Sequence, residues 1–440
     1  MVAKINRLGS AAASVRYFER DGGYYARNDP EHRRASRWHG AGAAALGLKG
    51  RVDARRFREV LEGKVPKTDI RLGRRTREGE TEHEPGRDIT FNPPKSVSLE
   101  GLLWGRDDVV RAHEGAVKAT LDYIEARILE TRVWDREFKR MRRAPAPLMV
   151  AATFRHITSR DLDPQLHTHC IVANMTRDAE GRWRSLDTGR LKAAEMAIGA
   201  FYRNELARRL MERGYTLSPS MAGGVPSFEI AGYGRAEVFV FSKRRRAILK
   251  YVREQGWNYN AARAQQAALA TRARKNEPGR AALEELWRGQ AKELGLVRPR
   301  KRRTQPPPVL SMLEIALRAA AHLEERHSVF AANDLVTRCL AHSPGRYTIR
   351  DVDEAIAQLL RDGHLLETVR RGVSGRAFVT DRTVRTERGM LALLREGAGA
   401  GGPLTAAAPV ETRLAASVLT DGQKQAVRTI LLHDDLVVGL

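Results

Sequence analysis

The first three hundred residues of the chain predict a fold that mixes strands with helices, and three segments carry this prediction. Two of them, APLMVAATFRH (residues 146–156) and QLHTHCIVANM (residues 165–175), are rich in β-branched and alternating apolar residues, as is typical of strands. In the third, residues 108–131, apolar side chains recur at spacings of three and four, which indicates a long amphipathic helix.

Shorter elements are predicted before and between these segments. Residues 2–8 have the pattern of a first strand, and Ser10 is a suitable N-cap for a helix over residues 11–20. The segment RDITFNPPKSVSL (residues 87–99) indicates a strand that is broken by a turn at its two prolines. Helices are expected again over residues 190–295, where the sequence includes the very basic run SKRRR.

The clearest domain boundary is the segment VRPRKRRTQPPPV. Its three consecutive prolines exclude a helix, and the basic run before them favours a solvated linker. An arm that contacts phosphates is the alternative. We therefore expect four parts: residues 1–296, a basic and proline-rich linker over 297–310, a small and mostly helical module over 311–395, and residues 396–440, whose last segment begins like a helix and finishes like a strand.

The charge balance indicates a partner that carries many negative charges. Of the 440 residues, 77 are Lys or Arg and 53 are Asp or Glu, a formal net charge of +24, which fits nucleic acid most simply. A membrane surface fits less well, because the sequence has no run of about 18 apolar residues. We expect no membrane insertion. The two distant cysteines and an N-terminus without the apolar core of a signal peptide indicate the cytoplasm.

Three histidines are concentrated in the segment HITSRDLDPQLHTHC. On a strand, side chains two residues apart lie on the same face, so His167 and His169 can bind one ion together. If the two strands pair as a hairpin, His156 supplies a third ligand, and Cys170 lies on the opposite face. Three imidazoles leave coordination positions open, as in a catalytic metal site. Zinc, manganese, nickel or copper suit such ligands better than magnesium. The competing interpretation is that the histidines face solvent without a metal.

Asp88 and Lys95 flank the two prolines of the broken strand. A carboxylate there is usually a cap or a surface residue. In a functional role, Asp88 would orient a metal-bound histidine or take a proton from a nucleophile. Lys95 could contact a phosphate, although an exposed lysine is the more common explanation.

Tyrosines are concentrated near the N-terminus in the segment YFERDGGYY, which contains Tyr17, Tyr24 and Tyr25. Apart from Phe18, the residues between them are charged or glycine, which suits a polar cleft better than a core. A tyrosine hydroxyl has a pKa near 10 and is a poor nucleophile until a base takes its proton or a metal activates its target. Beside a histidine metal site and a basic surface, these tyrosines predict transesterification on a phosphodiester.

These motifs resemble those of conjugative relaxases of the MobF class, the relaxase-helicases of F-type and related plasmids. The resemblance covers residues 1 to about 300. It depends on the tyrosine cluster and on the segments RWHGAGAAALGLKGRVD, DITFNPPKSVSL and TSRDLDPQLHTHCIVAN. The last of these is highly specific, and all of them stand in the order that the family shows.

The resemblance implies an α+β fold in which helices flank an antiparallel sheet, the palm of HUH endonucleases, with a helical extension over about 240–295 that closes over single-stranded DNA. It assigns the metal ligands to the three histidines, the neighbouring acidic residue to Asp88 and the nicking nucleophile to Tyr17. The first tyrosine pair of the family is Tyr17-Phe18 here, and the second, which serves a further strand transfer in some members, is Tyr24-Tyr25.

The expected cofactor is a divalent ion, Mn²⁺, Mg²⁺ or Zn²⁺, and the expected substrate is single-stranded or hairpin DNA of a transfer origin. Relaxosome accessory proteins and a coupling protein are the expected partners. We expect DNA contacts from five cationic side chains: Lys95, Arg155, Lys243, Arg244 and Arg245.

The segment LTDGQKQAVRTIL resembles the opening of the family's superfamily 1 helicase, the adenine-recognising segment before the nucleotide loop. The phosphate-binding pattern GxxxxGK[ST] is absent from the chain, so no ATPase or helicase activity is expected of it. A truncated helicase edge over residues 396–440 follows from this interpretation.

Two alternatives to a relaxase remain open at the level of the sequence. A rolling-circle replication initiator also pairs a histidine metal site with tyrosine, although the order of the motifs favours the relaxase. A non-catalytic DNA-binding protein with a structural metal is the other, although structural zinc usually has four protein ligands. A covalent adduct with DNA separates both enzymes from this binding protein, which would never form one.

Overall fold

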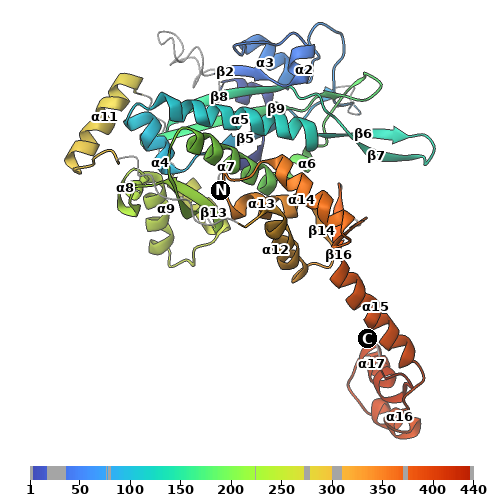
Figure 1. Ribbon diagram of the computed structural model, residues 1–440. Helices are drawn as coiled ribbons and strands as arrows, with labels where there is room; N and C mark the ends of the chain where they lie inside the picture. The colour runs from blue at the N-terminus through green and yellow to red at the C-terminus, as the bar shows by residue number, and fades with distance from the viewer. Residues whose placement is uncertain are drawn as a thin grey trace. The chain divides into compact units, whose positions relative to one another are not determined.

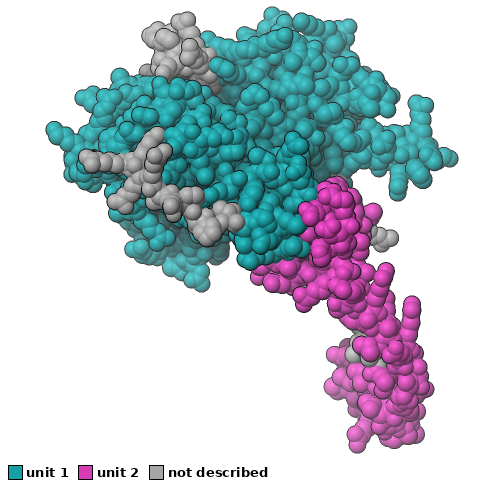
Figure 2. Space-filling model, viewed as in Figure 1, with its two compact units in different colours: residues 1–319, 332–355 teal, residues 320–331, 356–440 magenta. Residues whose placement is uncertain are grey.

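The computed structural model describes the following residues: 3–16, 36–75, 77, 81–222, 224–271, 278–299, 310–369 and 375–436. The chain divides into two compact units, residues 1–319 with 332–355 and residues 320–331 with 356–440, which Figure 2 colours teal and magenta. Most of the predicted linker, residues 300–309, lies outside the described residues. All strands of the main sheet belong to the first unit.

A five-stranded sheet in the order β1–β5–β9–β8–β2 forms the centre of the first unit (Figure 1). In that order, its strands are Ala3–Arg7, Gly86–Phe91, Pro164–Ala173, Ala151–Thr158 and Ser36–His39. Every neighbouring pair is antiparallel. The predicted first strand, the two β-branched strands and the α+β class are confirmed.

Two long helices, α5 (Asp107–Arg127) and α7 (Glu195–Glu212), pack on one face of the sheet. The rings of Tyr202 on α7 and Phe91 on β5 lie 4.9 Å apart between their centroids. The helix predicted over residues 108–131 is confirmed, but it ends earlier, because β6 begins at Glu130.

Shorter helices cover the opposite face: residues 11–16, α2 (Ala41–Ala45) and α3 (Ala54–Leu61). The predicted cap is present, because the backbone N–H of Ala13 donates to Oγ of Ser10 over 3.1 Å. Val15 and Phe57 are buried in one apolar cluster with Phe154 of β8 and Ile171 of β9. The N-terminal helix therefore packs on this face of the sheet.

Two parts of the chain differ from their predicted secondary structure. After the prolines, the chain does not resume a strand but forms two helical segments, α4 (Lys95–Ser98) and η2 (Leu99–Leu103). Pro94 starts the first of these helices, and the buried hydroxyl of Ser98 accepts a hydrogen bond from Leu166 N over 3.1 Å. The region predicted as helical is interrupted by the hairpin of β12 (Leu217–Ala222) and β13 (Val225–Ile230). Its turn contains Gly224 at φ +80°, a conformation that favours glycine.

The remaining short elements before the helical extension are two-stranded ladders and one helix. The ladders are β3–β4, β6–β7 and β10–β11, whose strands are Arg74–Arg75, Thr81–Glu82, Glu130–Asp135, Arg140–Pro145, Thr176–Arg177 and Trp183–Arg184. Helix α6 is Thr188–Ala193.

The predicted helical extension is present as α8 (Arg235–Val240), α9 (Lys243–Glu254), α10 (Ala261–Ala270) and α11 (Arg280–Glu293). It packs on the body through an apolar cluster that includes Leu283 and Trp287 of α11.

Residues 310–436 contain helices and a small sheet. The helices are α12 (Met312–Glu324), α13 (Ala332–His342), α14 (Ile349–Arg361), α15 (Asp381–Glu396), α16 (Ala407–Ala415) and α17 (Asp421–Leu432), and the three-stranded sheet β14–β16–β15 contains Phe330–Ala331, Ala377–Thr380 and Leu365–Thr368. The helical start of the last segment is confirmed, and residues 437–440 of its expected strand lie outside the described residues. No helix among the described residues is long and apolar enough to cross a membrane.

Candidate metal centre and nucleic-acid surface

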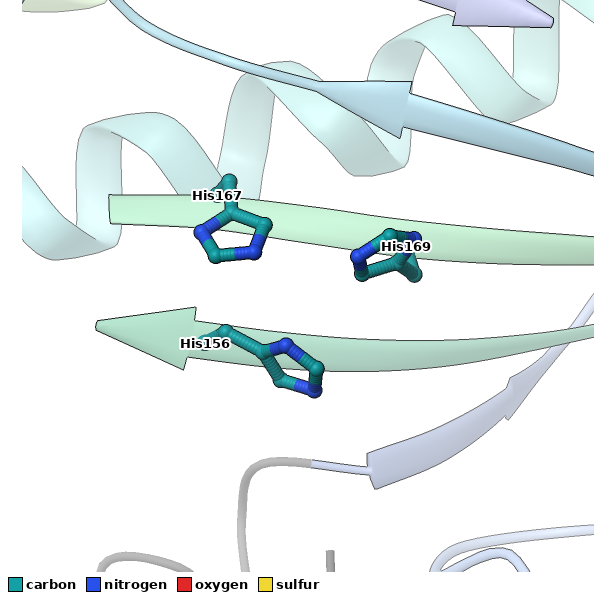
Figure 3. Close-up of side chains that lie close together, drawn as sticks. All are labelled: His156, His167 and His169. Carbon is teal, nitrogen blue, oxygen red and sulfur yellow. The ribbon is translucent and has the colours of Figure 1, made fainter. Parts of the chain in front are cut away.

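The three predicted histidines lie together on the central hairpin of the sheet. His156 of β8 is directly opposite His167 of β9, and His169 is opposite Phe154, so all three imidazoles lie on one face. Figure 3 shows the rings turned toward one another from the two strands. Their centroids are 5.1 to 5.3 Å apart, and one ligand atom from each lies within 4.8 Å of the others.

Hydrogen bonds decide which nitrogen two of these histidines offer. Nδ1 of His169 lies 2.8 Å from Oδ2 of Asp88, and Nδ1 of His167 lies 2.9 Å from the carbonyl oxygen of Gln165. Since a carboxylate and a carbonyl only accept, each Nδ1 carries the proton and each Nε2 has a lone pair. Neutral imidazoles oriented in this way are the form that binds metals.

The residues fit a catalytic rather than a structural metal site. Among the described residues, the group of possible ligands contains three histidines and no fourth side chain. A metal–nitrogen bond of about 2.0–2.1 Å is compatible with nitrogens this close together. The face that the histidines share also contains Asp88 and Thr90 of β5, since these pair with Ile171 and His169. Asp88 is 15% exposed, so it is a neighbour of the site and not a surface cap.

A buried polar network supports the histidine strand from behind. Thr168, which points to the opposite face from its two neighbours, lies 2.8 Å from Nε2 of His113 on α5, and Nδ1 of His113 lies 2.7 Å from the hydroxyl of Tyr202. All three side chains are buried. Burial lowers the pKa of His113 to about 3, so this imidazole stays neutral. The network was not anticipated from the sequence, because its members are far apart in the chain.

The predicted tyrosines Tyr17, Tyr24 and Tyr25 lie outside the described residues. The described part of the first helix ends at Arg16, one residue before Tyr17. Val15 on that helix is fully buried in the cluster that contains Phe154, which lies two residues before His156 on the same strand face. The described part of this helix therefore ends on the side of the sheet that holds the histidines.

Two of the five predicted DNA-contacting cations are engaged by hydrogen bonds or ion pairs within the protein. The ammonium of Lys95 donates to the carbonyl of Pro164 over 3.0 Å and to Oε1 of Gln165 over 2.6 Å, and burial lowers its pKa to about 8. Arg155 lies on the α5 side of the sheet, where it forms an ion pair with Glu114 over 2.6 Å. A groove on this side of the sheet has a volume of about 420 Å³, and Arg155 lines it together with Arg37, Arg111 and Lys118.

The other three predicted cations lie at the start of α9 and have different surroundings. The backbone N–H of Lys243 donates to Oδ2 of the buried Asp163 over 2.7 Å, and its ammonium lies 3.7 Å from Oδ1. Arg244 donates to carbonyl oxygens of Ala268 and Thr271 at the end of α10, where a cation is favourable. Arg245 is exposed. Of the SKRRR run, Arg245 is thus better placed for a phosphate than Arg244.

A basic hairpin that the sequence analysis did not single out extends from the sheet as β6 and β7 (Figure 1). Three exposed cations, Arg136, Lys139 and Arg140, lie in and beside its turn, together with the exposed ring of Phe138. At its base, Arg132 and Arg143 pair with the buried Asp187. In the sequence, the basic run REFKRMRR follows a segment in which polar and apolar residues alternate, and this pattern indicates a charged hairpin rather than a linker.

Comparison with protein families and curated proteins gives consistent results. A family model described as TrwC relaxase matches residues 11–294. Two proteins of Escherichia coli, both named multifunctional conjugation protein TraI and one from strain K12, are each 31% identical to this chain, over 379 and 384 residues. The matches cover 79% and 80% of this chain but 20% and 21% of the relatives. The chain therefore spans about a fifth of the length of the curated relatives that it matches.

Solved structures of the conjugative relaxase TrwC are similar to the first two thirds of the chain. A metal-bound complex with OriT DNA is 34% identical with a TM-score of 0.59, and it covers 67% of this chain and 99% of that chain. A complex with a 27-mer DNA comprising the recognition hairpin and the cleavage site has the same identity and coverage and a TM-score of 0.58. A copper-bound complex is 35% identical with a TM-score of 0.60, and it covers 67% of this chain and 98% of that chain.

Proposed function

The chain belongs to the TrwC relaxase family, and we propose that it nicks one strand of transfer-origin DNA and stays covalently attached to the 5′ end. The observation that carries this proposal is the set of three histidines on one face of an antiparallel hairpin, with Asp88 oriented on one of them. The relaxase part of the chain would be residues 1–296, followed by the linker over 297–310, the module over 311–395 and the helicase edge over 396–440.

The metal centre is formed by His156, His167 and His169, which would hold a divalent ion such as Mn²⁺, Mg²⁺ or Zn²⁺ through their nitrogens. A bound ion would polarise the scissile phosphate and stabilise the charge that develops on its oxygens. Asp88 accepts the Nδ1 proton of His169 and so fixes the tautomer and the orientation of that ring. Between the two roles that the sequence left open for Asp88, the hydrogen bond supports the orienting one.

Tyr17 is the proposed nucleophile. Its hydroxyl oxygen forms a bond to the phosphorus as the bond from phosphorus to the 3′ oxygen breaks. The tyrosine loses a proton and the leaving 3′ oxygen takes one up, so the products are a 5′-phosphotyrosyl end and a free 3′-hydroxyl. The bond energy is retained in the phosphotyrosine, and religation by the reverse step needs no nucleotide. Tyr24 and Tyr25 are proposed for a second strand transfer.

The hairpin β6–β7 is the proposed contact to the duplex part of a hairpin substrate. A two-stranded β-ribbon fits the major groove of DNA, and exposed Arg136, Lys139 and Arg140 provide charges for its phosphates. One TrwC structure contains DNA with a recognition hairpin. Arg245 at the helical extension is a proposed contact for the single strand. The proposed setting is the cytoplasm, with relaxosome accessory proteins and a coupling protein as partners.

Covalent capture tests the reaction directly. Overlapping oligonucleotides that span a candidate transfer origin are incubated with the protein and Mn²⁺ and separated on a denaturing gel. A slow-migrating adduct is expected with one of them, and it should be absent in Tyr17→Phe. Tyr259→Phe is the matched control, because Tyr259 is 60% exposed and has no proposed role. Chelation should stop adduct formation while DNA binding persists.

Two outcomes would contradict the proposal. An adduct that remains in Tyr17→Phe would assign the nucleophile to another residue. A protein that binds metal and DNA tightly but gives no adduct with any oligonucleotide would be a DNA-binding protein without this activity.

A further inference from the structure

The turn between β8 and β9 separates His156 from His167, and the strand ladder alone does not fix its shape. His156 pairs with His167 and Thr158 pairs with Pro164, so the register shifts directly after His156. Such a bulge interrupts the ladder and turns nearby side chains. Within the turn, Leu162 has φ +58°, a left-handed conformation that is unfavourable for a residue with a Cβ atom. Leu162 N donates to the carbonyl oxygen of Ser159 over 3.1 Å within the turn, and contacts from outside the hairpin add to this bond.

One of these contacts comes from Trp287 on α11. Its indole N–H donates to the carbonyl oxygen of Leu162 over 2.7 Å. Trp287 is 1% exposed, and its ring packs in a buried cluster with Leu283 and Leu99. Leu162 and Ile157, the residue after His156, pack against the same cluster. One helix of the extension thus donates a hydrogen bond to the turn at Leu162, and Ile157 packs against the cluster to which this helix contributes.

A second anchor comes from the start of α9. Asp163, which is 1% exposed, accepts from the backbone N–H of Lys243 over 2.7 Å, and its own carbonyl accepts from Ser159 N over 3.0 Å. A carboxylate at a helix N-terminus is favoured by the helix dipole. The turn is therefore held by hydrogen bonds from two helices that lie 80 and 125 residues further along the chain.

We propose that Trp287 is a positioning residue for the metal centre, because its N–H fixes the turn that sets how His156 faces His167. The inference rests on the proposed metal centre and adds a task to the helical extension. Beyond any role in covering DNA, α11 determines the geometry in which the histidines meet. Loss of the indole N–H should loosen the metal site without removing a ligand and without changing the DNA-binding surface.

The test is metal binding by the full chain after it has been stripped with a chelator. Co²⁺ alone is the probe, since its visible absorption reports ligand geometry and calorimetry gives its affinity. Trp287→Phe keeps an aromatic ring in the cluster but removes the donor. We expect Co²⁺ to bind about tenfold more weakly than to the unchanged protein, as for other residues that orient metal ligands, and its absorption bands to shift. Single-stranded DNA should bind the metal-free variant as tightly as before.

Leu283→Ala is the matched control for packing in the same cluster. It removes apolar side-chain atoms but leaves the Leu162 carbonyl untouched, so it should lower the unfolding midpoint at least as much as Trp287→Phe while leaving the Co²⁺ spectrum unchanged. A merely structural role for Trp287 would give the two variants the same metal behaviour, and that result would overturn the inference.

Asp163→Ala provides a second variant that releases the same turn, and it is used if Trp287→Phe does not fold. It should weaken Co²⁺ binding in the same direction, and wild-type affinity in this variant would count against the inference. Co²⁺ binding by the unchanged protein and by His167→Ala separates the proposed metal centre from the proposed positioning role of Trp287. If both fail to bind Co²⁺, the metal centre itself is wrong. If the unchanged protein binds and Trp287→Phe binds equally well, only the positioning role fails.

Discussion

Asp88 determines which nitrogen of His169 is available to a metal ion. Its carboxylate accepts from Nδ1 over 2.8 Å, and both side chains are about 85% covered by protein, so the bond competes little with water. Asp88→Ala is therefore expected to weaken Zn²⁺ binding about 10–100-fold. The Zn²⁺ affinity of Asp88→Asn should lie between those of the unchanged protein and Asp88→Ala, because the amide oxygen of Asn still accepts a hydrogen bond. Calorimetric titration measures this, with Asp69→Ala, an exposed carboxylate, as the control. Unchanged affinity in Asp88→Ala would remove the orienting role.

His113 gives the fold a defined sensitivity to acid. Its folded pKa of about 3 lies below the ordinary 6.5, so between these values the unfolded chain binds more protons than the folded one. Stability from this residue is complete above pH 6.5 and falls as the pH drops toward 3. The slope reaches about 1.4 kcal/mol per pH unit.

Urea unfolding from pH 7.5 to 4, with a chelator present to keep the metal ligands unloaded, measures the contribution of His113. His113→Gln retains hydrogen-bonding groups but does not titrate, so part of the acid-dependent loss of stability should disappear in it. An identical pH dependence in both proteins would show that other groups carry the acid sensitivity.

Single residues also show where prediction from the sequence ends. The grouping of His167 and His169 follows from the period of a strand, and His156 follows from pairing in a hairpin. The partners of Arg244 and Lys95 could not be predicted, because they depend on how α10 and the bulged start of β9 pack against distant segments. A basic run indicates charge, but which cations reach solvent is decided by tertiary contacts.

Among the elements, the hairpin β6–β7 has the clearest separable task. Alanine at Arg136, Lys139 and Arg140 should weaken binding to a DNA hairpin. The slope of log affinity against log salt should become less steep by about 0.9 for each phosphate that the protein no longer neutralises. Nicking of a short single strand without a duplex should be unchanged, since the substitutions lie away from the histidines. Fluorescence anisotropy with both substrates at several salt concentrations measures this.

A charge-matched control keeps that experiment specific to the hairpin. Alanine at the exposed Arg338, Arg350 and Arg361 removes the same formal charge from α13 and α14. If both triple variants lose hairpin affinity equally, the effect belongs to net charge and the β-ribbon has no particular role.

Elements differ in how far local sequence determines them. Helix α5 and the strands of the sheet other than β2 were predicted from local patterns of apolar residues, whereas β2 (Ser36–His39) was not predicted. The segment after Pro94 was predicted as the second part of a strand broken at its two prolines. It is helical because the buried hydroxyls of Ser96 and Ser98 accept backbone N–H groups of β13 and β9. The β12–β13 hairpin was missed because its turn signal, a pair of glycines, was outweighed by the helices around it.

The whole molecule carries a net charge of +24, and this excess should dominate its affinity for DNA. Each neutralised phosphate of a single strand contributes about −0.7 to the slope of log affinity against log salt. Six or more contacts to a 20-nucleotide strand would give a slope of about −4 or steeper. This expectation follows from the sequence alone, since it depends on composition and not on the placement of any one side chain.

That slope should be measured with Tyr17→Phe, because the unchanged protein would form a covalent adduct and its binding to DNA would not reach equilibrium. Binding to a labelled 20-nucleotide strand is followed between 50 and 400 mM salt, with and without a chelator. The slope should be nearly the same in both conditions, since the histidines contribute no net positive charge when they are neutral and a metal ion adds charge at one phosphate only. An affinity that hardly changes with salt would mean that base stacking, not phosphate contact, holds the strand, and the basic surface would then need another partner.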